Sequence, residues 1–171
     1  MLISDLFNSQ FLLRGVLLTQ VLWTIAANAQ DTSSTAGLVI ETVAERRMLP
    51  TDEAATVRFV AADQLNIGDE IFYTVRVRNA SNVTIEDVVV IKAVPRNTEY
   101  VADSAMGPAA IIGYSTDGGG TFAESDELEV TTLSGATRRA RPGDYTHLRW
   151  QLRHPLAAGA TALLRFRSVF K

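Results

Sequence analysis

Alternating apolar and polar side chains constrain this chain more than any other feature of its sequence. Between residues 70 and 78, the two faces of an extended strand would differ sharply in polarity. One face carries Ile71, Tyr73, Val75 and Val77, and the other carries Phe72, Thr74, Arg76 and Arg78. Because successive side chains of a β-strand point to opposite faces, this pattern predicts a strand with one face in a core and the other mostly in water.

The same alternation recurs towards the C-terminus. The side chains expected to point inward there are Leu148, Trp150, Leu152, Leu164, Phe166 and Phe170. Turn-forming Gly, Asn, Asp and Pro residues separate these segments. The candidate strands are residues 38–46, 55–61, 70–79, 85–94, 98–102, 109–115, 127–133, 145–152 and 161–170. About seven to nine short strands with regular turns predict an all-β antiparallel sandwich, without a helix after the N-terminal segment.

One candidate strand is apolar on both faces. Residues 88–91 read Val-Val-Val-Ile within the segment 87–93. Such a run is typical of a strand that is covered on both sides or lies near the middle of a sheet, and we expect this position for it.

Composition limits the class of protein. A chain of 171 residues with 47% hydrophobic residues suits one domain with a sizeable core. The net charge is −3, with acids and bases interspersed, so no basic surface for nucleic acid is expected. The chain has no cysteine, which excludes disulfides, thiolate metal sites and a cysteine nucleophile.

The first 29 residues have the pattern of a secretory signal peptide. Arg14 precedes an uncharged segment, residues 15–30, which ends in Ala27-Asn28-Ala29. A short apolar run followed by Ala-x-Ala predicts cleavage after Ala29 and export, to the periplasm or the exterior. An uncleaved anchor helix is the alternative, but the run is shorter than the ~20 residues that span a bilayer. Membrane contact is expected only through this segment before cleavage, and residues 30–37 are expected to form a flexible leader before a β-sandwich domain at 38–171.

A set of short motifs resembles a known family. Gly68-Asp69 is followed by residues 73–79, Tyr-Thr-Val-Arg-Val-Arg-Asn, then by Val88-Val89-Val90, by Val94-Pro95 and by Tyr100-Val101 with Ser104. In order and spacing these resemble the bacterial conserved repeat domain, known as domain of unknown function number eleven, over roughly residues 55–171. Leu148-Arg149-Trp150 and the segment 156–159 also resemble members of a proteobacterial branch.

The resemblance implies an immunoglobulin-like sandwich in exported or cell-envelope proteins, and it implies no enzymatic activity. One position departs from the family pattern. Family members commonly have Asp three residues before the Pro, where this chain has Lys92 ahead of Pro95. Any role of that Asp in other members is therefore in doubt here.

Residues 115–122, Ser-Thr-Asp-Gly-Gly-Gly-Thr-Phe, fit the Asp-box pattern that is best known from sialidase-like propellers. A glycosidase relative is one interpretation. We favour a hairpin turn, in which Asp117 accepts backbone N–H groups, the glycines adopt positive φ and Phe122 packs beneath. The motif occurs once, and the chain is too short for several propeller blades.

Metal and acid–base sites have weak support in the sequence. The acids expected on loops, and therefore weighed as calcium ligands, are Asp103, Asp117, Glu124, Asp126 and Glu127. They match no EF-hand spacing. The two histidines, His147 and His154, lack the spacing of a metal motif, and no Gly-x-Ser-x-Gly is present. The adjacent pairs Glu86-Asp87 and Asp126-Glu127 would point to opposite faces if extended. No catalytic, cofactor-binding or metal-binding residue is predicted.

The densest positive patch is Arg138-Arg139-Ala140-Arg141, which is expected on a loop. It is interpreted as a solvated cluster, with contact to anionic envelope components as the alternative. Asn79 and Asn82 begin glycosylation sequons, but turn chemistry explains them better in a chain of bacterial type.

The sequence as a whole favours a non-catalytic, exported structural or interaction module of the bacterial envelope. Its partner is an unidentified protein or envelope component. A carbohydrate- or cell-wall-binding module is the alternative, and a hydrolase is a weaker one. Partner binding could use the loops at one end or an open sheet edge.

Overall fold

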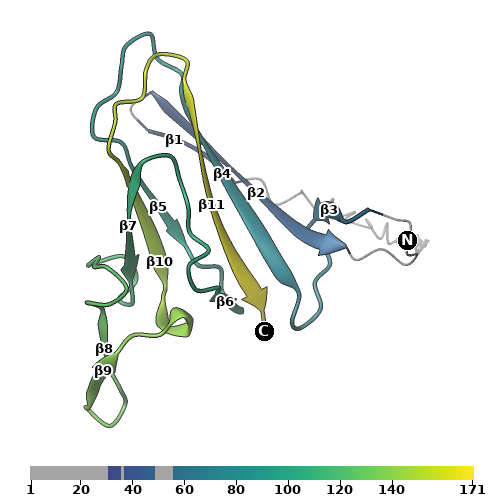
Figure 1. Ribbon diagram of the computed structural model, residues 1–171, viewed down its shortest axis with the longest axis vertical. Helices are drawn as coiled ribbons and strands as arrows, with labels where there is room; N and C mark the ends of the chain where they lie inside the picture. Colours follow the sequence, from purple (N-terminus) through teal and green to yellow (C-terminus); the bar gives the residue numbers. More distant parts are fainter. Residues whose placement is uncertain (1–30, 36, 49–55) are drawn as a thin grey trace, which may run out of the picture.

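The computed structural model describes residues 31–35, 37–48 and 56–171. It is an all-β, antiparallel structure in which two sheets face each other (Figure 1). The strands are β1 (Asp31–Thr35), β2 (Leu38–Met48), β3 (Arg58–Ala61), β4 (Glu70–Asn79), β5 (Val89–Ala93), β6 (Thr98–Tyr100), β7 (Ala110–Ser115), β8 (Glu129–Thr131), β9 (Thr137–Arg139), β10 (His147–Leu152) and β11 (Thr161–Phe170). Within the described residues, helical structure is limited to one 3₁₀ turn, η1 (Pro142–Asp144). The predicted signal peptide lies outside the described residues.

The large sheet has the strand order β1-β2-β4-β11-β6, and β3 also pairs with β2. The small sheet has the order β5-β10-β7, and β8 and β9 form a separate hairpin. In Figure 1 the small sheet and the hairpin lie on the left, and the large sheet lies on the right. The expectation of an all-β sandwich is therefore confirmed.

The core lies between the two sheets and contains the side chains that the alternation predicted. Trp150 of β10 and Phe166 of β11 are almost completely buried, with ring centroids 6.0 Å apart across the sandwich. Tyr73 of β4 stacks on Phe166 at 4.5 Å. Burial of large aromatic side chains supplies much of the hydrophobic stabilisation of a small domain. Phe170 is only half-buried, at the end of β11.

Asn79, the last residue of the motif at residues 73–79, has a clear structural role. It ends β4 and is completely buried. Its side-chain amide donates hydrogen bonds to the carbonyls of Val83 (2.7 Å) and Leu156 (2.8 Å), and its oxygen accepts one from the backbone N–H of Ser81. A buried side chain with all these bonds fixes two turns at one end of the sandwich.

Most strand predictions are right in position, and the two long ones at 70–79 and 161–170 agree with the structure at both ends. The prediction for residues 30–37 needs correction. This segment was expected to be a flexible leader, but Asp31–Thr35 forms β1 and pairs antiparallel with Leu38–Thr42 of β2. The polar composition that suggested a leader includes Thr residues, whose branched Cβ is compatible with a strand.

The predicted position of the strand at residues 87–93 is also wrong. The apolar run was expected to be covered on both faces or central in a sheet, but β5 is an edge strand of the small sheet. Val88 and Val90 are buried, whereas Val89 and Ile91 are 44% and 48% exposed. Residues 88–91 therefore alternate between buried and exposed like those of other strands of the sandwich, but their exposed side chains are apolar instead of polar.

Trp150 tests this core. We expect Trp150→Ala to lower the free energy of unfolding by about 3–5 kcal/mol, because the substitution leaves a large cavity between the sheets. Leu133→Ala is the control, since Leu133 is fully exposed on the β8–β9 turn. Chemical denaturation measures both variants. In a Trp23→Phe background, the emission of Trp150 should resist acrylamide, and quenching as efficient as for free tryptophan would contradict its place in the core.

Candidate functional site

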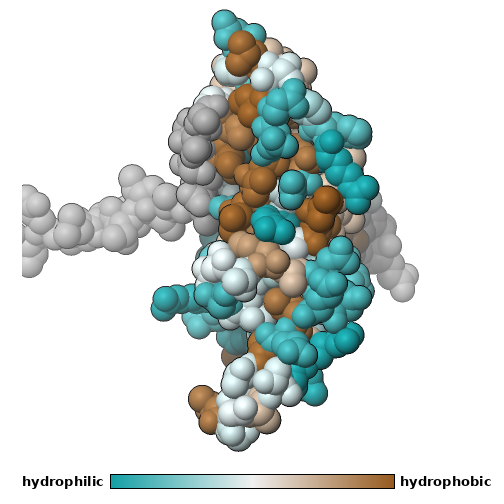
Figure 2. Space-filling model, turned by 90° about the vertical axis from the view of Figure 1, so that its left-hand side faces the viewer, coloured by the Kyte–Doolittle hydropathy of each residue, from teal (hydrophilic) through white to brown (hydrophobic). Residues whose placement is uncertain are grey.

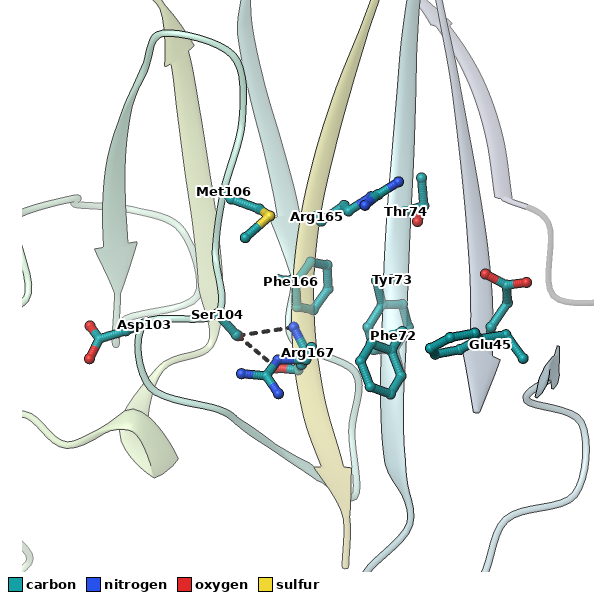
Figure 3. Close-up of a pocket in the computed structure, with 11 residues that line it drawn as sticks. Glu45, Phe72, Tyr73, Thr74, Asp103, Ser104, Met106, Arg165, Phe166 and Arg167 are labelled. Atoms are coloured by element: carbon teal, nitrogen blue, oxygen red, sulfur yellow. Dashed lines mark hydrogen bonds between the residues drawn. The ribbon is translucent and has the colours of Figure 1, made fainter. Parts of the chain in front are cut away.

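The most enclosed of the described surface pockets lies on the outer face of the large sheet, where β2, β4 and β11 run side by side (Figure 3). The strand register places Glu45 of β2 and Arg167 of β11 on either side of Phe72 of β4. In the next outward row, Thr74 of β4 lies beside Arg165 of β11. The outer face of the large sheet, which the alternation predicted to face solvent, therefore carries the Phe72 ring between Glu45 and Arg167.

A second aromatic ring comes from β3. Phe59 lies opposite Arg47 of β2 in the register, which puts it on the same outer face as Phe72. The two rings meet edge to face, with centroids 5.0 Å apart and planes at 83°. Phe59 is 51% exposed. This pair forms the apolar wall of the pocket towards β3.

The opposite wall is the loop after β6. Ser104 is buried, and its hydroxyl donates to the carbonyl of Val101 (2.6 Å) and accepts the backbone N–H of Arg167 (3.0 Å). Met106 exchanges backbone hydrogen bonds with Arg165, each 2.9 Å long. These contacts hold the loop against β11 and place the Met106 side chain at the rim of the pocket (Figure 3). Asp103 also lines the pocket, but its carboxylate is directed away from the phenylalanine rings (Figure 3).

Charges surround the apolar part of this pocket. Arg167 forms an ion pair with Glu70 (2.7 Å), and its guanidinium lies 6.0 Å from the centre of the Phe72 ring. Arg165 makes no ion pair with any residue in the described ranges, and it extends towards Thr74 (Figure 3). The pocket has a volume of about 440 Å³ and is open to solvent. It can receive an apolar group and offers an arginine to a neighbouring anion.

The Asp-box segment forms the hairpin turn that we favoured. Asp117 accepts backbone N–H groups from Gly120 (2.9 Å) and Thr121 (3.0 Å), and the hydroxyl of Ser115 donates to it at 2.7 Å. Gly118 and Gly119 have φ of +84° and +91°, which L side chains rarely adopt.

Phe122 anchors the same turn on the outer face of the small sheet. Its Cβ packs close to Gly113 of β7, and its ring lies under the Arg149 guanidinium of β10, 4.9 Å from the ring centre. The Asp117 carboxylate is thus engaged within its own turn, and Phe122 holds the turn against the sheet.

The hydrogen bonds to Asp117 have a consequence for pH. The Ser115 hydroxyl, followed by the backbone and hydroxyl of Thr121, holds the pKa of Asp117 well below its usual range. Because the folded pKa lies below the unfolded value of about 3.9, the ionised carboxylate stabilises the fold above that pH. This contribution is lost as the pH falls through the folded pKa.

The arginine cluster differs from the expectation of a loop. Arg138 lies in β9, which sequence analysis missed, and it forms a two-pronged ion pair with Asp144 of η1 at 2.7 and 2.8 Å. This guanidinium holds the pKa of Asp144 below its usual value. Arg139 and Arg141 are exposed. One of the three arginines therefore has a structural role in closing the hairpin.

The other candidate residues do not converge. His147 lies on β10 beside Gly119, and its ring Nδ1 is 3.2 Å from the Thr146 hydroxyl, whereas His154 is exposed in the following turn. Across the part of the chain that the structure describes, no three His, Asp or Glu side chains are grouped so as to hold a metal ion. The loop acids proposed as calcium ligands are included in that statement.

Comparison with protein-family models, with curated proteins and with solved structures finds no match for this chain. The resemblance to the conserved repeat domain therefore stays a prediction. Of the described residues, none belongs to a helix with the length and hydrophobicity needed to cross a membrane.

Sequence reasoning missed the pocket because its residues come from five separated segments. One signal was visible: Phe72 interrupts an outward row that otherwise consists of Thr and Arg. An aromatic residue at a predicted solvent position is a candidate for binding, but the contributions of Phe59 and Met106 depend on the strand order.

Asp117→Ala tests the turn. We expect a lower melting temperature at pH 7, because four backbone or hydroxyl donors lose their acceptor, and a smaller difference from the native chain as the pH falls below about 4. Thermal melts between pH 2 and 7 measure this. Asp126→Ala is the control, because Asp126 is an exposed loop acid with no side-chain hydrogen bond within the described residues. A difference that is independent of pH would contradict the stabilisation by the ionised carboxylate.

Proposed function

We propose that this chain is an exported, non-catalytic interaction module with an immunoglobulin-like sandwich, which binds a partner protein of the cell envelope or exterior. The partner inserts an apolar side chain into the pocket between Phe59, Phe72 and Met106. An acidic group next to that side chain pairs with Arg165. The predicted signal peptide and the family resemblance support export and the immunoglobulin-like class.

The composition of the pocket carries this proposal. Its apolar part consists of two phenylalanines and a methionine, and its rim includes two arginines. Aromatic residues, Met and Arg are the types enriched in protein–protein interfaces relative to other surfaces. A ring that is already paired edge to face and backed by a sheet loses little conformational freedom on binding, which favours affinity.

The side chains that would favour a carbohydrate platform are in the core. Trp150, Tyr73 and Phe166 all point inward, and each is at most 8% exposed. The exposed pair Phe59 and Phe72 is edge to face, so it offers no flat shelf for a sugar ring. These observations weaken the carbohydrate-binding alternative relative to a protein partner.

The hydrolase alternative drew its support from the Asp-box. The Asp117 carboxylate accepts hydrogen bonds from Ser115, Gly120 and Thr121, so both of its oxygens are used within the turn. A catalytic carboxylate needs an oxygen that faces a substrate. The geometry therefore supports a role for this residue in the turn itself.

Site-specific photo-crosslinking tests the proposal. The mature chain carries benzoylphenylalanine in place of Phe59 and is mixed with envelope extract from the source organism. We expect a discrete protein adduct that Met106→Asp abolishes, because a charge in the pocket opposes insertion of an apolar group. The same photo-reactive residue at Leu133 is the control, since Leu133 is even more exposed than Phe59 and lies on the distant β8–β9 turn. Identical adducts at both positions, or adducts that survive Met106→Asp, would contradict the proposal.

Once the cross-linked partner is identified, its affinity for the native chain and for a pocket variant measures how much the pocket contributes to binding. We expect Phe72→Ala to weaken binding about 10- to 100-fold, as for a central aromatic residue of an interface. A thermal melt of the variant checks that the sheet remains folded.

A further inference from the structure

The outer edge of β5 has no strand beside it among the described residues. β10 pairs with β5 on the other side, with Ile91 opposite Arg149. The N–H of Val94 donates to Thr146, and the carbonyl of Val88 accepts from Leu152, so the even-numbered residues of β5 bond to β10. Because alternate residues of a strand direct their backbone groups to opposite sides, the N–H and C=O groups of Val89, Ile91 and Ala93 face away from β10.

The side chains at this edge are apolar and exposed. Val89 and Ile91 are 44% and 48% exposed on the outer face of the small sheet, and Ile111 of β7 is 40% exposed on the same face. Figure 2 views the molecule from the side on which the small sheet lies, and hydrophobic residues, in brown, run along its middle between hydrophilic ones. Proteins usually protect such an edge, because open backbone groups beside apolar side chains are a template for another strand.

The opposite edge of the small sheet is protected. Tyr114 of β7 exchanges two backbone hydrogen bonds with Ala123, at 2.9 and 3.1 Å, so the Asp-box hairpin covers part of that edge. The unpaired residues of β7 on that side, Ala110 and Ile112, are only partly exposed. The two edges of one sheet therefore differ, and β5 is the open one.

We propose that β5 pairs antiparallel with β5 of a second copy of this chain, with Ile91 opposite Ile91, and so joins two small sheets into one continuous sheet. In this register Val89 lies opposite Ala93 of the second copy, and each of the outward-facing residues exchanges backbone hydrogen bonds with its partner. The Val89 and Ile91 side chains of both copies then form one apolar strip on the outer face.

The ends of β5 select this register. Asp87 has φ of +50°, which ends the extended conformation before the strand, and Pro95 has no N–H to donate after it. Shifting the pairing in either direction would bring one of these residues into the ladder and lose bonds. A shift that centres the pair on Lys92 would also place two lysines opposite each other.

The charges flanking β5 complement each other in the same arrangement. Glu86 precedes the strand, and Arg96 follows it, and both are exposed. Antiparallel pairing about Ile91 puts Glu86 of one copy opposite Arg96 of the other at both ends. A parallel arrangement would put like charges side by side. The two-fold pairing also covers the open β5 edge of both copies. No open β5 edge remains for a third copy, so this contact closes as a dimer.

The test measures self-association of the full mature chain by sedimentation equilibrium from micromolar to millimolar concentration. We expect a monomer–dimer equilibrium whose dissociation constant rises at least about tenfold with Ile91→Lys, because a charge then enters the apolar strip. Ile111→Lys is the matched control, since it places the same charge on the same face at the protected edge, and we expect no change. A chain that stays monomeric throughout, or an equal effect of the two variants, would overturn the proposal.

Disulfide trapping gives an independent readout of the register. The chain has no cysteine, so a single substitution can be followed. Opposite residues of a hydrogen-bonded antiparallel pair have Cα atoms about 5.5 Å apart, which a disulfide can bridge. We expect oxidation to cross-link Ile91→Cys to itself, and Val89→Cys to Ala93→Cys when the two variants are mixed, but not Val89→Cys to itself. Self-cross-linking of Val89→Cys in preference to Ile91→Cys would contradict this register.

These outcomes are separable from the pocket proposal. The Ile91 and Phe59 positions lie on different sheets, so Ile91→Lys should leave photo-crosslinking at Phe59 unchanged. Loss of the dimer with the pocket adduct retained would show that the two surfaces act independently.

Discussion

The antiparallel pairing of β4 with β11 is the interaction on which the rest of the structure depends. The two strands are joined from Glu70 opposite Val169 to Arg78 opposite Thr161, and both lie in the interior of the large sheet. On their inner face, Tyr73 stacks on Phe166, which faces Trp150 across the sandwich. On their outer face, the same two strands carry Phe72 and Arg167. One strand pair thus builds the middle of the core and the middle of the candidate site, and a one-residue slip would disrupt both.

This arrangement divides the molecule into surfaces with different chemistry. The outer face of the large sheet carries a pocket with an aromatic wall and a charged rim. The outer face of the small sheet carries the anchored Asp-box turn near one edge and the open strand β5 at the other. Both proposed contacts use side chains or backbone groups that the core does not need. The fold can therefore keep its stability while its partner surfaces vary, which is common when binding is placed on a rigid scaffold.

Local sequence patterns predicted most of the strands and turns well, but they predicted poorly which strands lie side by side. The alternation at β4, β10 and β11 identified the buried aromatic residues, since period two decides which side chains face the core. The Asp-box turn was predicted correctly because its bonds join residues within a few positions of each other. The run at β5 was misjudged because apolar composition does not reveal whether a strand is central or at an edge, which depends on strand order.

The pocket lay beyond prediction for the same reason. Phe59 and Met106 line one pocket with Phe72 only because β3 pairs with β2 and the loop after β6 bonds to β11. β1 was missed because the short polar segment before Leu38 shows no alternation, and its strand depends on a long partner in β2. Non-local pairing thus determines the features that sequence reasoning could not reach.

Hydrogen–deuterium exchange, resolved by residue, tests most directly whether the β4–β11 pair is the centre of stability. Amides that bond within β4 and β11 should exchange slowest, through global unfolding, while those of the hairpin β8–β9 and of β3 exchange faster through local opening. Exchange of β4 and β11 at rates as fast as the β8–β9 hairpin would contradict the account.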